Sequence, residues 1–303
     1  MKYAQIVHNP TAGCGLHNKK FIINLMMSYD YSVAYISTKD EDAWRKFSPK
    51  PGIKLFIAGG DGTVTKVMNR ILEIEKDKRP EIEILPLGTA NNIYHSLRLN
   101  RLQERNKNDT NFDFGIINGH ATKLNFFEGM GLGIFPHLIQ EMQKAPEKFH
   151  TTKDKINYAL QSMIDLVGRF EGVQLNIVTD SGTFQGNFML VEVMNIHFLG
   201  PQIPIPSEGN TRDGFLDLLM ITIDHRSFFV DYLKKLLNGS TTKSDLSLFS
   251  TFCKVSKVNI SFENELIHID DEIFYSESRQ NLELKLENKG LKVFPTDLEE
   301  FRC

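Results

Sequence analysis

The chain has 303 residues, a length typical of about two domains. Its 35 Lys and Arg residues against 38 Asp and Glu residues give a net charge of −3, which argues against a protein that mainly coats nucleic acid. Hydrophobic residues make up 41% and charged residues 24% of the chain, so the composition is that of a globular protein and excludes wholesale disorder.

From the distribution of apolar residues, we expect neither an export signal nor a membrane-spanning helix. The longest apolar run, residues 215–223, is much shorter than the roughly 18 residues that a spanning helix needs. The N-terminus, MKYAQIVHNP, turns polar before a signal-peptide core could form. Cys14, Cys253 and Cys303 lie far apart, unlike a disulfide framework or a metal motif. We expect a cytoplasmic protein that can be peripheral at a membrane.

The first hundred residues alternate apolar runs with helical patterns. The runs, each expected to be a strand, are residues 3–7, 31–36, 53–58 and 82–85. Val64, Val67 and Ile71 recur at helical spacing after the third run, and a shorter helix is expected around Ile93 and Leu97. Apolar strands that are each followed by a helix predict an α/β domain with a parallel sheet over residues 1–110.

Beyond a polar segment, residues 98–111, which we expect to be a linker or an exposed excursion, the pattern changes. The turn signals Asn118-Gly119, Asp180-Ser181-Gly182 and Asn288-Lys289-Gly290 separate short runs, as in β-hairpins. We predict a second, mainly antiparallel β domain over residues 111–294, and leave open whether residues 295–303 join the first domain. Its strands are expected at 173–178, 183–194, 216–223, 255–260, 266–269, 282–286 and 291–294, and its helices at 156–167 and 227–237.

The strongest chemical signal is Gly59-Gly60-Asp61-Gly62-Thr63, between the third strand and its helix. Glycines allow close backbone approach, so several N–H groups can converge on a phosphate, and the helix N-terminus adds a partial positive charge. Asp61 is then expected to hold Mg²⁺, or water on Mg²⁺, that bridges the phosphates. The alternative is a tight strand–helix turn in which Asp61 only caps.

Other nucleotide motifs do not occur. The chain has no G-x-x-x-x-G-K-[ST] loop, and the glycine-rich run 129–133 is not spaced as G-x-G-x-x-G, which disfavours dehydrogenase chemistry. His8, His197 and His268 lie in or beside predicted strands without a second ligand at metal spacing, so we expect them to be structural.

Several motifs occur in a fixed order along the chain. They are Asn9-Pro10-Thr11-Ala12-Gly13, the 59–63 motif, the segment 85–92, Asn195, the proline-rich segment 200–206, the segment 213–217 and Ile269-Asp270-Asp271-Glu272. Together they resemble the diacylglycerol kinase catalytic-domain family, in particular bacterial lipid kinases related to sphingosine kinases. The resemblance implies an α/β domain like that of phosphofructokinase and NAD kinase, then a β-sandwich domain, with ATP in the cleft between them.

The resemblance also implies roles for individual residues. Those expected to bind ATP are Asn9, Thr38, Gly59, Gly60, Asp61, Gly62, Thr63, Gly88 and Thr89. Asp270 is expected to act as the general base on the lipid hydroxyl, with Glu272 in support. Asp213 is expected to bind a structural Mg²⁺, completed by main-chain oxygens around Asn210 and Phe215.

The residues themselves also support a catalytic role for the acidic turn. Crowded carboxylates bind Mg²⁺ or raise one another's pKa, and either property suits phosphoryl transfer. Taken alone, an acidic turn after a strand is more often a solvated turn. The accompanying phosphate-type loops favour catalysis.

Three positions depart from the family pattern. Asn92 stands where the family usually has Asp, so a carboxylate is lost. Thr65 and Lys66 replace the usual Asn and Glu, and Asp271 replaces the glycine of D-G-E. These changes leave the metal geometry and the level of activity open.

The predicted function is ATP-dependent transfer of a phosphoryl group, with Mg²⁺, to a hydroxyl of diacylglycerol or a related lipid alcohol. Two alternatives remain: a kinase of a soluble metabolite such as NAD or a sugar, and a nucleotide-binding regulatory protein without turnover. The expected partners are the lipid substrate and, transiently, a membrane surface, but not nucleic acid. A homodimer is left open.

Overall fold

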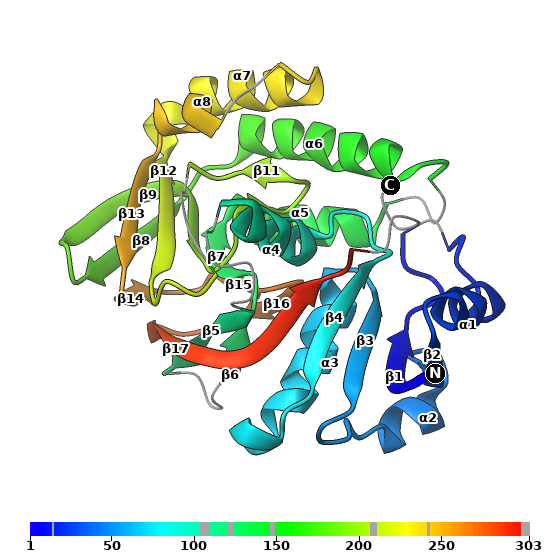
Figure 1. The fold of residues 1–303 in the computed structure, drawn as a ribbon. Helices are drawn as coiled ribbons and strands as arrows, with labels where there is room; N and C mark the ends of the chain where they lie inside the picture. The colour runs from blue at the N-terminus through cyan, green and yellow to red at the C-terminus, as the bar shows by residue number, and fades with distance from the viewer. Residues whose placement is uncertain are drawn as a thin grey trace. The chain divides into compact units, whose positions relative to one another are not determined.

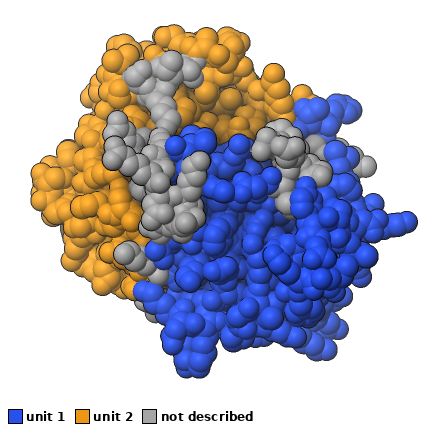
Figure 2. Space-filling model, in the orientation of Figure 1, with its two compact units in different colours: residues 1–112, 148–152, 289–303 blue, residues 113–147, 153–288 orange. Residues whose placement is uncertain are grey.

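The computed structural model describes residues 1–13, 15–103, 110–119, 124–145, 149–206, 211–240 and 243–297. The chain forms two compact units, which Figure 2 shows in different colours. Unit 1 comprises residues 1–112, 148–152 and 289–303, and unit 2 comprises residues 113–147 and 153–288. The boundary predicted from the sequence lies after residue 110, with the place of the C-terminal tail open.

Unit 1 is an α/β unit with a parallel sheet (Figure 1). Its strands follow the order β17-β4-β3-β1-β2, and every neighbouring pair in this order is parallel. The predicted parallel α/β fold is therefore confirmed. The elements are β1 (Lys2–His8), α1 (Lys19–Ser28), β2 (Tyr31–Ser37), α2 (Glu41–Lys46), β3 (Lys54–Gly59), α3 (Asp61–Leu72), a 3₁₀ turn (Lys76–Lys78), β4 (Glu81–Pro86), α4 (Asn92–Gln103) and the end of β17 (Gln280–Pro295).

Local sequence explains where the helices of unit 1 begin and which face they bury. Asn18 and Asp40 precede α1 and α2 as N-caps, and their side chains accept hydrogen bonds from Phe21 N and Ala43 N. Along α3, the residues at helical spacing form its buried face: Thr63, Val64, Val67, Met68 and Ile71. The predicted helix after the glycine motif is thus confirmed, and its first turn contains Asp61.

Unit 2 is built on antiparallel strands. Its longest path of paired strands is β16-β15-β7-β9-β8-β14-β17, and β12 joins β9 on one side and β13 on the other. The predicted, mainly antiparallel β domain is confirmed. The elements are β5 (Asn111–Asn118), β6 (Leu124–Phe126), β7 (Gly129–Gly133), α5 (Ile134–Gln143), α6 (Thr152–Arg169), β8 (Val173–Thr179), β9 (Thr183–Met194), β10 (Phe198–Leu199), β11 (Ile203–Pro204), β12 (Leu216–Thr222), a 3₁₀ turn (Ile223–His225), α7 (Arg226–Leu237), α8 (Lys243–Ser247), β13 (Thr251–Val255), β14 (Lys257–Phe262), β15 (Leu266–Ile269) and β16 (Glu272–Tyr275).

The hairpin predicted at Asn288-Lys289-Gly290 is wrong. These residues lie inside β17, which runs without a turn from Gln280 to Pro295 and is drawn in red in Figure 1. The strand changes partners at this point, because its antiparallel pairing with β14 ends at Lys285 and its parallel pairing with β4 begins at Lys292. The turn-like residues mark the place where the strand passes from one unit to the other.

Two other predictions need correction. The polar segment 98–111 is not a linker throughout, because α4 continues to Gln103 and β5 begins at Asn111. Asn100, 1% exposed, continues the buried face of the helix despite its polarity. The strand predicted at 255–260 is divided at Ser256, whose N–H and hydroxyl donate to the Asp180 carboxylate, so that β13 and β14 are separate strands.

Within the described residues, no helix has both the length and the apolar character that crossing a membrane requires.

The side chain of Arg79 ties the end of α3 to β17 within unit 1. Its guanidinium donates to Leu72 O, Ile74 O and Gly290 O. We expect Arg79→Ala to lower the free energy of unfolding by about 2 kcal/mol, because three carbonyls lose a charged donor. Urea unfolding followed by the fluorescence of Trp44, the one tryptophan of the sequence, measures this in unit 1.

Lys78→Ala is the control for this variant. Lys78 precedes Arg79 directly, but it pairs with Glu75 at the surface, where an ion pair contributes little. An equal loss of stability in both variants would contradict the role given to Arg79.

Candidate functional site

Two glycine turns of unit 1 meet backbone to backbone. Gly60 follows β3 and Gly88 follows β4, and a Cβ atom built on Gly88 would lie 2.3 Å from Gly60 Cα. Leu87 N also donates to Gly59 O at 3.0 Å. A side chain at either glycine would force these turns apart. The glycines predicted to form a phosphate-binding turn are therefore brought together with those of the next turn, at the carboxyl ends of parallel strands, where open α/β sheets bind ligands.

The turn after β1 joins the same edge of the sheet. Asn9 Nδ2 donates to Thr63 Oγ1 at 3.2 Å, so the first predicted motif contacts the first turn of α3. A Cβ atom on Gly13 would lie 2.5 Å from Leu87 O, and Gly13 has a φ of +58° that favours glycine. Thr38, after β2, donates its N–H to His8 O, the residue before Asn9. Four strand ends thus carry the residues predicted to bind nucleotide.

Asp61 holds the start of another helix. Its carboxylate accepts hydrogen bonds from Asn92 N at 2.9 Å and Ile93 N at 3.0 Å, the first residues of α4. This is a capping role, as in the alternative left open by the sequence, although the capped helix is α4 rather than α3. Because Asn92 contributes its backbone N–H, its departure from the family Asp leaves this contact intact. The role of Asp61 as a ligand of Mg²⁺ stays a prediction.

Asn91 fixes the turn that contains Gly88 and Thr89. Its side-chain oxygen accepts from Gly88 N at 2.8 Å, and its side-chain nitrogen donates to Gly88 O at 3.1 Å. The residue itself has a φ of +51°, a conformation that Asn tolerates better than most residues. Sequence analysis included Asn91 in a motif but did not predict this role.

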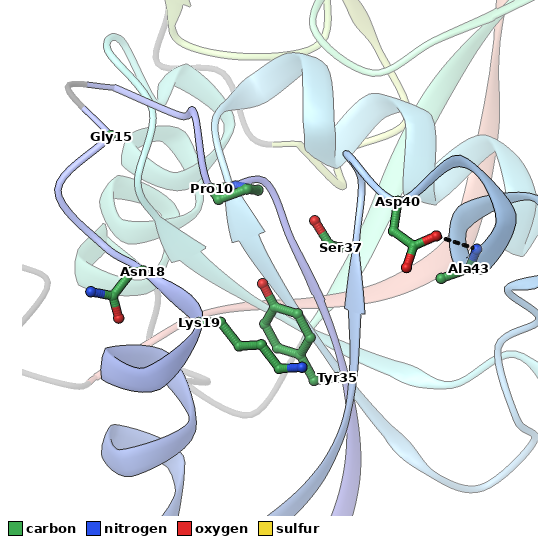
Figure 3. A pocket seen from close by; sticks show the side chains of 8 residues that line it. All are labelled: Pro10, Gly15, Asn18, Lys19, Tyr35, Ser37, Asp40 and Ala43. Atoms are coloured by element: carbon green, nitrogen blue, oxygen red, sulfur yellow. Dashed lines mark hydrogen bonds between the residues drawn. The ribbon is translucent and has the colours of Figure 1, made fainter.

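A cavity of about 390 Å³ opens beside the turn after β1 (Figure 3). Lys19 Nζ lies 4.9 Å from the centre of the Tyr35 ring, and Asp40 caps α2 at the opposite wall. The lining residues are Pro10, Gly15, Asn18, Lys19, Tyr35, Ser37, Asp40 and Ala43. The cavity thus combines an aromatic ring, a cation and a carboxylate next to predicted residues Asn9 and Thr38, and sequence analysis did not find it.

Behind this cavity, His8 is a neutral, structural side chain. Burial, followed by the nearby His17, lowers the pKa of His8 to about 4. Its Nδ1 atom lies 2.8 Å from the hydroxyl of Tyr35, which it orients. This contact agrees with the structural role expected for His8.

In unit 2, the predicted catalytic carboxyls share one tight turn. Ile269 pairs with Glu272 across β15 and β16, so Asp270 and Asp271 form the two-residue loop of a β-hairpin, here called the acidic hairpin (residues 266–275). The left-handed residue of this loop is Asp270, with a φ of +48°. Asp271 therefore does not need the conformational freedom of the glycine that the family has at this position.

The carboxyl group of Asp270 is buried and is hydrogen-bonded to backbone amides. It accepts hydrogen bonds at 2.8 to 3.2 Å from the N–H groups of Phe127, Glu128 and Gly129, and Asp270 is 6% exposed. Burial raises the pKa of Asp270 to about 6, although the three amides act in the opposite direction. Glu272, by contrast, is exposed at the start of β16.

The predicted structural Mg²⁺ site lies in another turn of unit 2. Asp213 Oδ1 accepts from Phe215 N at 3.0 Å, and Asp213 Oδ2 forms an ion pair with Lys254. The ammonium group of Lys254 thus lies beside the carboxylate that is predicted to bind Mg²⁺. No group of three or more His, Cys, Asp or Glu side chains in the described parts of the chain is arranged to hold a metal ion. Asn210 lies outside the described residues, and the site stays a prediction.

Two further polar residues organise unit 2. Asp113, 1% exposed, accepts from Gly214 N at 3.2 Å and so supports the Asp213 turn. Asn195 donates to Asp113 O at 2.7 Å and to Phe127 O at 3.3 Å. Asn195, which the motif analysis noted, therefore links the Asp213 turn to the amides that hold Asp270.

Comparison with protein families gives two matches. Residues 4–124 match the diacylglycerol kinase catalytic domain, and residues 140–275 match the YegS C-terminal NAD kinase beta sandwich-like domain. Residues 4–124 thus form a domain of the diacylglycerol kinase catalytic-domain family, a family of lipid kinases, and the family predicted from the motifs is confirmed.

Similar proteins cover almost the whole chain. It is 25% identical over 291 residues to diacylglycerol kinase of Bacillus subtilis (strain 168), with 90% of both chains covered. It is 25% identical over 287 residues to diacylglycerol kinase of Staphylococcus aureus (strain JH9), covering 89% of this chain and 86% of that one. A crystal structure of a diacylglycerol kinase from Bacillus anthracis str. Sterne matches with a TM-score of 0.62 at 18% identity, over 98% of this chain and 97% of the other, and this likeness shows the fold.

The raised pKa of Asp270 predicts a pH dependence of stability. Because the pKa in the folded protein, about 6, exceeds the ordinary value of 3.8, the folded state binds the proton more tightly than the unfolded state. The stabilisation is complete below about pH 4 and is lost as the pH rises through 6, by on the order of 2–3 kcal/mol. Asp270→Asn should remove this part of the slope. Urea titrations of both proteins between pH 4 and 7 measure it, and parallel slopes would contradict the assignment.

Proposed function

We propose that this chain is an ATP-dependent lipid kinase that phosphorylates a hydroxyl of diacylglycerol or a related lipid alcohol. The observation that carries the proposal is the meeting of the Gly60 and Gly88 turns at the start of α3, in a domain of the diacylglycerol kinase catalytic-domain family. Its relatives in Bacillus subtilis and Staphylococcus aureus are diacylglycerol kinases.

In this proposal, unit 1 binds ATP. The positive end of the helix dipole lies at the start of α3, and there it favours phosphate oxygens near Gly60. The cavity beside Pro10 has a volume in the range of small-ligand sites and would take the nucleoside, with the ring of Tyr35 on one wall. Asn9 donates to Thr63 of α3 and precedes Pro10 of the cavity, and Thr38 follows Ser37 of the cavity.

Mg²⁺ bound with ATP would neutralise part of the phosphate charge. Asp61 is the acidic residue of the phosphate turn and its proposed protein ligand. Its carboxylate accepts the backbone N–H groups of Asn92 and Ile93. The same contacts fix its position, so the group would need little reorganisation on binding.

For the two carboxyl groups that are predicted to act on the lipid hydroxyl, Asp270 and Glu272, the geometry favours other roles than those expected from the sequence. Asp270 has its oxygens directed at three backbone amides, whereas Glu272 is exposed. We assign proton acceptance to Glu272 and the support of the hairpin to Asp270. The lipid oxygen attacks the γ-phosphorus, its proton passes to Glu272, and the bond from the γ-phosphorus to the bridging oxygen breaks to release ADP.

A lipid acceptor requires contact with a membrane surface. No described helix could span a membrane, so the proposal includes a transient, peripheral contact through which unit 2 receives the lipid. A homodimer stays a prediction.

Glu272→Gln tests the assigned base. We expect kcat for phosphorylation of diacylglycerol in mixed micelles to fall by roughly 10²-fold or more, with the KM for ATP nearly unchanged, because only the proton acceptor is removed. Glu277→Gln is the control, since Glu277 is an exposed carboxyl nearby in the chain. Equal activity of the wild type and Glu272→Gln would contradict the assignment.

The same assay separates the other functions. The wild type is offered NAD, a sugar panel and diacylglycerol side by side, and ATP binding is measured by calorimetry. Turnover of NAD or a sugar in preference to lipid would identify a soluble-metabolite kinase. ATP binding without transfer to any acceptor would identify a regulatory protein.

A further inference from the structure

Three adjacent strands of unit 2 place a buried glutamate and a buried histidine on either side of a glycine. Gly131 of β7 pairs with Glu192 of β9 on one side and with His268 of β15 on the other. His268 Nε2 lies 2.9 and 3.0 Å from the two carboxylate oxygens of Glu192. The two side chains therefore meet across the middle strand.

Gly131 makes this contact possible. A Cβ atom built on Gly131 would lie 2.3 Å from the carboxyl carbon and one oxygen of Glu192. Any side chain at this position would displace the carboxylate from His268. The glycine-rich run 129–133 does not fit a nucleotide-binding fingerprint. Within this run, glycine is required at position 131 because the Glu192 carboxylate occupies the place of a side chain.

The pair is isolated from water and holds a proton. Glu192 is 0% and His268 4% exposed. Burial raises the pKa of Glu192, and burial alone would lower that of His268, but the Glu192 carboxylate beside it raises the pKa of His268 instead. A buried carboxylate is costly in free energy unless it is paired, and here His268 is its partner.

The other nitrogen of the histidine reaches the acidic hairpin. His268 Nδ1 lies 2.9 Å from Asp270 O, and since a carbonyl can only accept, Nδ1 carries a proton. Asp270 in turn donates its N–H to Gly129 O at 2.8 Å. The ring of Phe135 from α5 packs beside His268 with the ring centres 5.3 Å apart. The orientation of the imidazole is thus set on three sides.

We propose that Glu192 and His268 are positioning residues for phosphoryl transfer: they hold the main chain of the acidic hairpin so that Glu272 is presented in one place. This rests on the proposed function, in which Glu272 accepts the proton. Neither residue touches the substrate in this account. Displacement of a reacting group by about 1 Å can lower a rate by 10²-fold, so a device that fixes the hairpin matters to kcat rather than to nucleotide binding.

Two substitutions at Glu192 separate positioning from packing. Glu192→Met keeps an unbranched side chain of similar length but leaves His268 Nε2 without a polar partner. Glu192→Gln can donate its amide to Nε2 while Nδ1 still donates to Asp270 O. We expect kcat to fall by about tenfold or more in Glu192→Met, with the KM for ATP within about twofold of the wild type, and to recover most of the loss in Glu192→Gln.

Gly131→Ala disrupts the same contact without touching either partner. Its methyl group would occupy the place of the Glu192 carboxylate, and we expect the same fall in kcat. The control is Gly168→Ala in α6, where an added Cβ meets nothing within 4 Å. This substitution should leave activity unchanged, because alanine is more favourable than glycine inside a helix.

Hydrogen–deuterium exchange tests the positioning without any substrate. Segments 124–133 and 266–275 contain the amides of Phe127, Glu128, Gly129 and Asp270 that bond across the hairpin. We expect these segments to exchange faster in Glu192→Met and Gly131→Ala, but not in Glu192→Gln or Gly168→Ala.

The outcomes are distinct. Unchanged exchange in Glu192→Met and Gly131→Ala overturns the inference, and so does faster exchange with unchanged kcat. A rise in the KM for ATP equal to the fall in kcat would also overturn it, as would a Glu192→Gln variant as slow as Glu192→Met. A wild type that phosphorylates no lipid would refute the proposed function and the role in transfer with it, whereas the exchange result would still show whether the pair holds the hairpin.

Discussion

Each candidate site depends on a carboxylate that binds backbone amides of a neighbouring turn. Asp61 accepts from the first two residues of α4 in unit 1, and Asp270 accepts from Phe127, Glu128 and Gly129, at the start of β7 in unit 2. Hydrogen bonds to an ionised acceptor are about twice as strong as neutral ones. A side chain from one motif thereby fixes the main chain of another, so the motifs work as pairs rather than singly.

Glycines provide the room that these pairs need. At Gly60 and Gly88 the absence of side chains lets two turns touch through their Cα atoms, and at Gly131 it lets Glu192 reach His268. The first case brings backbone close to a proposed phosphate, and the second lets two polar side chains meet inside a sheet. Both are steric requirements, and neither depends on the flexibility for which glycine is often invoked.

Strands and helices that depend on local periodicity were predicted correctly from the sequence. The first four strands of unit 1 and the helix after Gly60 were predicted correctly because apolar runs and helical spacing are local properties. The edge at which the motifs gather followed from parallel pairing alone. The hairpin at Asn288-Lys289-Gly290 failed for the opposite reason. Turn propensity is local, but a strand that exchanges one partner for another is held by β14 and β4, which the local sequence does not contain.

The partners of the acidic residues could not be predicted in the same way. Asp61 and Asn92 are 31 positions apart, and Asp270 and Phe127 are 143 apart, so no spacing rule connects them. The motif marked both aspartates as chemically important without showing that their oxygens are directed at backbone. Once those contacts are known, exposure separates the two carboxyls of the hairpin. Backbone amides hold Asp270 in the interior, whereas Glu272 is exposed at the start of β16. The motif that was predicted to be one catalytic unit therefore divides into a supporting residue and a proposed reacting residue.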